Sequence, residues 1–60
     1  MTIDRYELQR EARANLDVIE ANLGRVRSAP WRFCRNGRLL EQNRELFRAN
    51  ERLLAELRAS

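Results

Sequence analysis

A seven-residue repeat in the second half of the sequence constrains the fold more than any other feature. It reads Asn36-Gly-Arg-Leu-Leu-Glu-Gln, then Asn43-Arg-Glu-Leu-Phe-Arg-Ala, then Asn50-Glu-Arg-Leu-Leu-Ala-Glu, and ends in Leu57. Apolar residues that recur every three or four positions are typical of an α-helix with one buried face. The repeat therefore predicts a helix over residues 38–58.

The apolar face of this helix is unusually broad. In heptad notation it comprises Leu39, Leu46 and Leu53 at d, Leu40, Phe47 and Leu54 at e, and Asn43, Asn50 and Leu57 at a. A simple two-stranded coiled coil uses a narrow a/d seam and places charged residues at e. Because e is apolar throughout, the helix is expected to pack against two neighbours at once, as in a helical bundle.

A second amphipathic pattern occupies the first half of the chain. Apolar residues recur at steps of four, four, three and four along one expected helical face, which comprises Leu8, Ala12, Leu16, Ile19 and Leu23. Asp4 has the side chain of an N-cap residue and precedes Glu7, which suits a capping box. We expect a helix over residues 4–26, because Val26 extends the same face.

The segment between the two patterns contains signals that interrupt a helix. Pro30 disfavours helical geometry at the residue before it, and Asn36-Gly37 is a strong turn pair. Residues 27–37 are therefore predicted to form a connector that lets the chain reverse.

These elements predict an all-α fold in one small domain over residues 1–60, namely a two-helix hairpin. A chain of 60 residues buries only about 60% of the surface that it exposes when unfolded, so it needs additional stabilisation. One cysteine and no histidine leave neither a disulfide nor a metal site. We therefore expect two hairpins to join into a four-helix bundle through the broad heptad face. The alternative is an extended parallel coiled coil over residues 38–58.

Asn43 and Asn50 are polar residues within the expected apolar face. An unpaired buried amide costs about 1–3 kcal/mol, so both residues should have hydrogen-bond partners. Such pairs across an interface would fix helix register and oligomer number. The alternative is that both amides lie at a hydrated edge of the face.

Positive charge is concentrated in the middle of the chain. Residues 21–40 contain five arginines and no acidic residue, whereas the whole chain has a net charge of +3. Arginine binds phosphates and carboxylates, and aromatic side chains provide stacking surfaces. The residues expected to contact a partner are Arg25, Arg27, Trp31, Arg32, Phe33, Arg35 and Arg38. In the alternative interpretation the two aromatic residues close the end of the bundle and the arginines only face water.

The sequence offers little for catalysis. It lacks histidine and a glycine-rich phosphate loop, and Cys34 reads as a small apolar filler. We expect no cofactor and no metal. No apolar run is long enough to span a membrane and no secretory signal is visible, so a cytoplasmic location is expected.

Together these features predict a non-enzymatic interaction or structural module, or an accessory subunit of a larger complex. It would self-associate through its heptad helix and dock on a larger acidic protein surface through the arginine-rich connector. The alternative is a small nucleic-acid-binding regulator that uses the same basic connector.

Overall fold

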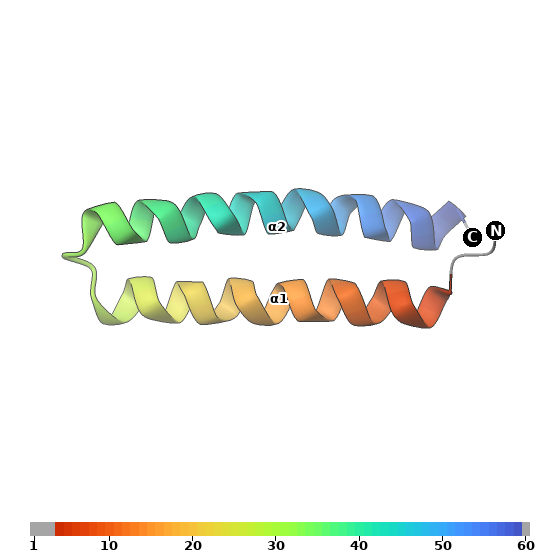
Figure 1. Cartoon of the computed structure of the whole chain (residues 1–60), viewed down its shortest axis with the longest axis horizontal. Coiled ribbons are helices and arrows are strands. Elements are labelled where there is room, and N and C mark those ends of the chain that lie inside the picture. Colours follow the sequence, from red (N-terminus) through yellow and green to blue (C-terminus); the bar gives the residue numbers. More distant parts are fainter. Residues whose placement is uncertain (1–3, 60) are drawn as a thin grey trace.

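Two long helices lie side by side and run in opposite directions (Figure 1). In this computed structural model, which describes residues 4–59, α1 spans Arg5–Ser28 and α2 spans Phe33–Ala59. The predicted all-helical fold and the predicted hairpin are therefore confirmed. The hairpin measures 47 × 15 × 14 Å. The start of α1 and the end of α2 meet at the end opposite the turn, which we call the open end (Figure 1).

Local hydrogen bonds explain where α1 begins and ends. The Asp4 carboxylate accepts a hydrogen bond from the Tyr6 backbone N–H at 3.0 Å, so Asp4 has the predicted N-cap role. At the other end the Arg25 carbonyl accepts bonds from the Ala29 N–H at 3.2 Å and from the Ser28 hydroxyl at 3.0 Å. These bonds satisfy a carbonyl that the helix itself would leave unpaired.

The reversal of the chain needs only four residues, Ala29 to Arg32. The Arg32 N–H donates to the Ala29 carbonyl at 3.1 Å, which closes a β-turn. Pro30 occupies the second position of this turn, where its fixed φ is favourable. As predicted, the helical path is interrupted at Pro30.

The predicted connector over residues 27–37 is wrong in its length, and Asn36-Gly37 is not a turn. Both residues belong to α2, which begins at Phe33 instead of residue 38. The reason is tertiary: the Asn36 side chain is buried and its amide donates to the Ala29 carbonyl at 3.0 Å. Gly37 is exposed on the outside of the helix, where a glycine is tolerated at a modest cost.

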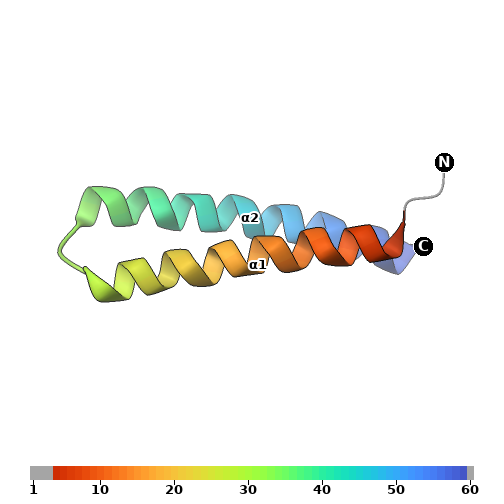
Figure 2. The ribbon, with the colours of Figure 1, turned by 60° about the horizontal axis from the view of Figure 1, so that its bottom comes forward.

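The core is a seam between the facing sides of the two helices, which cross at a shallow angle (Figure 2). The inner side of α1 is formed by Leu8, Ala12, Asn15, Ile19, Asn22 and Val26, and that of α2 by Asn36, Leu39, Asn43, Leu46, Asn50, Leu53 and Leu57. All of these residues are buried or half-buried. Only Leu8 and Ile19 are fully buried apolar residues among residues 4–59. The core is therefore small, and asparagines make up five of the thirteen inner residues.

The predicted inner face of the first helix is wrong at Leu16, which is 39% exposed. Leu23 is half-buried, whereas its neighbour Asn22 is only 1% exposed, so Leu23 lies at the edge of the seam. Their neighbours Asn15 and Asn22 take the inner positions instead. The helix is thus rotated relative to the orientation that hydrophobicity alone predicts.

Candidate interaction surfaces

Hydrogen-bonded asparagines connect the two helices along the seam. We call this set the asparagine ladder, and its members are Asn15, Asn22, Asn36, Asn43 and Asn50. Its most buried layer pairs Asn22, which is 1% exposed, with Asn43. The Asn22 amide donates to Asn43 Oδ1 at 2.9 Å and to Gln42 Oε1 at 2.7 Å. The Asn43 amide in turn donates to the Ile19 carbonyl at 3.4 Å.

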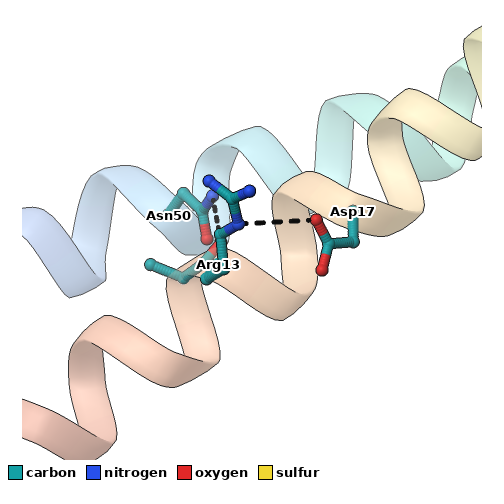
Figure 3. A network of polar contacts seen from close by, with 4 residues as sticks. Arg13, Asp17 and Asn50 are labelled. Carbon is teal, nitrogen blue, oxygen red and sulfur yellow. Dashed lines mark hydrogen bonds and ion pairs between the residues drawn. The ribbon is translucent and has the colours of Figure 1, made fainter.

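The next layer repeats the same geometry one heptad further along the hairpin. The Asn15 amide donates to Asn50 Oδ1 at 2.8 Å, and the Asn50 amide donates to the Ala12 carbonyl at 3.2 Å. Figure 3 shows Asn50 extending from α2 toward α1, next to the exposed ion pair of Arg13 and Asp17 at 3.6 Å. The outer ion pair adds little stability, whereas the inner amides are satisfied by specific partners.

The prediction that Asn43 and Asn50 have hydrogen-bond partners is confirmed, and the partners come from the same chain. The leucines of the predicted interface at a and d also face α1: Leu39, Leu46, Leu53 and Leu57 are half-buried. Sequence reasoning missed Asn15 and Asn22. They occur in two Ala-Asn-Leu triplets seven residues apart, the spacing of the asparagines in α2.

One side of the hairpin carries a row of partly exposed apolar residues. In each helix these residues come directly after a residue at heptad position d, which faces the other helix, so they occupy position e. In a pair of antiparallel helices the e positions of both helices lie on the same side of the seam. We call this row the apolar flank, and it comprises Leu16, Leu23, Leu40, Phe47 and Leu54. Leu40 is 40% exposed, and Phe47 and Leu54 are each 50% exposed. These three are the e residues of the predicted oligomer interface.

The opposite side of the seam is mainly polar. It is formed by Glu11, Val18, Arg25, Arg35, Gln42, Ala49 and Glu56. Gln42 and Arg25 both bond to Asn22 there, at 2.7 and 3.3 Å. Val18 is its exposed large apolar residue, at 40%. The hairpin therefore has exposed apolar side chains along the apolar flank and mainly polar side chains along the opposite side of the seam.

The turn end carries a second candidate surface. The side chains of Arg27, Arg32 and Arg38 are exposed and form no hydrogen bond or ion pair within residues 4–59. Trp31 and Phe33 are 68% and 81% exposed. We call these five residues the arginine tip. These aromatic side chains are open to solvent in the single hairpin, and their closing the end of a bundle stays an alternative prediction.

The two remaining arginines of the predicted contact set have structural partners. Arg35 Nη2 donates to the Arg25 carbonyl at 2.9 Å and thereby helps to cap the end of α1. The Arg25 guanidinium donates to Asn22 Oδ1 at 3.3 Å. The structure thus divides the predicted set into three free arginines at the tip and two that support the fold.

The chemistry available elsewhere in the described part of the chain is limited. Cys34 is exposed beside the tip, so its predicted role as an apolar filler is wrong. Residues 4–59 contain no cluster of acids and cysteine that could hold a metal ion. A hollow of about 580 Å³ at the open end is lined by Arg5, Leu54, Leu57 and Arg58, which include neither a nucleophile nor a carboxylate. Neither described helix is long and apolar enough to cross a membrane.

Comparisons with protein-family models, with curated proteins and with solved structures find no match to this chain. The geometry of the apolar flank and of the arginine tip is therefore the basis for the functional argument.

Proposed function

We propose that this protein is a non-enzymatic helical interaction module that pairs with a second copy of itself through the apolar flank. The resulting four-helix bundle would use its arginine tips to dock on a larger, acidic partner, as an accessory subunit in the cytoplasm. The observation that carries the proposal is the position of Leu40, Phe47 and Leu54, which remain 40–50% exposed after α1 has packed against α2.

The exposed area supports self-association. A compact monomer of 7.2 kDa is expected to expose about 4,100 Å². This chain exposes 5003 Å². The excess of about 900 Å² is similar to the roughly 800 Å² that each partner buries in a standard interface. Part of this excess follows from the elongated shape of 47 × 15 × 14 Å, and the apolar flank adds contiguous exposed apolar residues, which commonly mark a contact surface.

Two apolar residues of α1 provide a matched test. Leu16 on the apolar flank is 39% exposed and Val18 on the polar flank is 40% exposed. Leu16→Glu is expected to weaken self-association at least tenfold, because a carboxylate would be buried without a partner. Val18→Glu should leave it nearly unchanged. Sedimentation equilibrium over a concentration series measures both, with helix content checked by circular dichroism.

Phe47→Ser on α2 provides a second variant, since half of the Phe47 surface is exposed in the single hairpin. It should reduce self-association while the hairpin stays folded. If the unaltered chain is a folded monomer at micromolar concentration, or if Val18→Glu has the same effect as Leu16→Glu, the proposed pairing is wrong.

Charge supports the docking role of the tip. Three unpaired arginines stand beside two exposed aromatic side chains, in a stretch of twenty residues (21–40) without an acid. Guanidinium groups bind carboxylates in bidentate geometry, and an exposed Trp or Phe adds apolar contact area. The same composition favours a second candidate, a nucleic-acid-binding regulator, because arginine also binds phosphate and aromatic rings stack on bases.

Binding assays with charge-matched variants separate these candidates. Arg27→Gln/Arg32→Gln/Arg38→Gln removes the charge of the tip, and the control replaces Arg10, Arg48 and Arg52, which are exposed elsewhere. Fluorescence anisotropy with a labelled poly-glutamate peptide should show binding that the tip variant loses at least tenfold more than the control does.

Oligonucleotides in the same assay test the alternative. Tighter binding to a duplex or single strand, with about 0.9 log units of affinity lost per log unit of salt for each phosphate contacted, would favour the nucleic-acid role. Absence of binding to either probe at low salt would contradict both docking roles.

A further inference from the structure

We infer that the two copies pair with their turns at opposite ends, so that the assembled bundle presents one arginine tip at each end. This inference rests on the proposed self-association and adds its orientation. A dimer with this geometry is a two-ended connector between two acidic partners. A dimer with adjacent tips would instead form one doubled contact surface.

The apolar flank itself is compatible with both orientations. Two copies can stack flank to flank with the turns together or with the turns apart, and every neighbouring pair of helices is antiparallel in either case. Leu16 and Phe47 lie near the middle of the hairpin, so they are buried in both arrangements. The apolar contact therefore does not choose an orientation, and the choice depends on the charges at the two ends.

Charge differs sharply between the two ends. The arginine tip and the adjoining Arg25 and Arg35 contribute five positive charges with no acid in residues 21–40. The open end has no such excess, because its exposed acids Asp4, Glu7, Glu11 and Glu56 are matched in number by exposed Arg5, Arg10, Arg52 and Arg58. Turns together would bring ten arginines to one end of the bundle. Turns apart would instead place each tip beside its partner's open end, where positive and negative charges balance, and would keep the two tips away from each other.

Screening by dissolved salt limits the repulsion between two arginine tips to short distances. The hairpin is 47 Å long, several times the Debye length of about 8 Å at physiological ionic strength. Tips at opposite ends therefore do not repel each other, whereas adjacent tips stand within range of mutual repulsion. Like charges that are brought together across an interface suppress the corresponding arrangement.

The single cysteine of the chain allows the distance between the turn ends of the two copies to be measured directly. Cys34 is exposed next to the tip, so a nitroxide label can be attached without any substitution. With turns apart the two labels are expected to be about 40 Å apart, from the helical rise between Cys34 and the middle of the hairpin. With turns together they would be within about 25 Å, given interaxial distances near 10 Å. Double electron–electron resonance resolves these two distances.

The outcomes separate the orientation from the self-association. A distribution centred near 40 Å that disappears in Leu16→Glu supports the inference. A distance below 25 Å, or rapid oxidation of the unlabelled dimer to a Cys34–Cys34 disulfide, overturns the orientation and leaves the dimer standing. No dipolar signal from a chain that also sediments as a monomer overturns the proposed self-association itself.

Discussion

Asn22→Ala is expected to lower the free energy of unfolding by about 2 kcal/mol, a large share of the stability of a chain this small. The substitution removes the donor to the buried Asn43 Oδ1 and the bond to Gln42. A buried acceptor left without a donor costs more than the net value of the bond that is lost. Because Asn22 is 1% exposed, water cannot replace the missing amide without opening the seam.

Asn15→Ala is the matched control for this experiment. Asn15 has the same residue type and heptad position, but it is half-buried and its amide donates a single bond, to Asn50 at 2.8 Å. Its replacement should cost about half as much, because water can reach the vacated partner. Urea unfolding followed by circular dichroism at one fixed protein concentration measures both variants, since dimer stability depends on concentration. If both variants lose the same free energy of unfolding, the larger contribution expected of the buried layer is contradicted.

The amphipathic pattern was enough to predict two helices and a hairpin, but not the rotation of the first helix. Leu16 and Leu23 repeat at seven residues, and so do Asn15 and Asn22. Hydrophobicity favours placing the leucines inside. The asparagines take the inner positions because α2 presents Asn43 and Asn50 there, and a buried amide requires a polar partner. This preference exists only once the two helices are brought together, so one helix considered alone does not reveal it.

The residue at which α2 begins was not predictable either, because it also depends on contact between the two helices. Asn36-Gly37 has a local preference for turns, yet the four residues from Ala29 to Arg32 suffice to reverse the chain. Once the turn is this short, Asn36 lies against the end of α1 and its amide bonds to Ala29. Tertiary contact thus overrides local propensity at this position.

The candidate surfaces were predictable to different degrees. The apolar e positions of α2 are visible in the heptad repeat, so the exposure of Leu40, Phe47 and Leu54 follows from the breadth of that face. The contribution of α1 to the flank was not visible, because it depends on the rotation of that helix. Within the basic segment, sequence composition cannot distinguish Arg27, which is free, from Arg35, which caps α1. That distinction depends on which arginine reaches a carbonyl at the end of α1 after the turn has formed.

Replacing both members of the buried layer by leucine is expected to restore the stability that either single replacement removes. Asn22→Leu leaves Asn43 Oδ1 without its donor, and Asn43→Leu leaves the Asn22 amide with one acceptor fewer. Each single variant should therefore lose about 1–3 kcal/mol in the free energy of unfolding. In the double variant neither amide remains, and the two leucines bury apolar surface against each other. The resulting coupling energy is expected to be about 2 kcal/mol.

The double variant also tests what the asparagine ladder contributes beyond stability. A hydrogen-bonded amide pair accepts few alternative partners, whereas a leucine layer accepts any apolar surface. Sedimentation velocity of Asn22→Leu/Asn43→Leu should therefore show several oligomeric species where the unaltered chain shows one. Additive losses in the double variant would mean that the two asparagines do not act as a pair. A single species of unchanged size would mean that the asparagine ladder is not needed to specify the assembly. Its role would then be limited to holding α1 in the rotation that leaves Leu16 on the apolar flank.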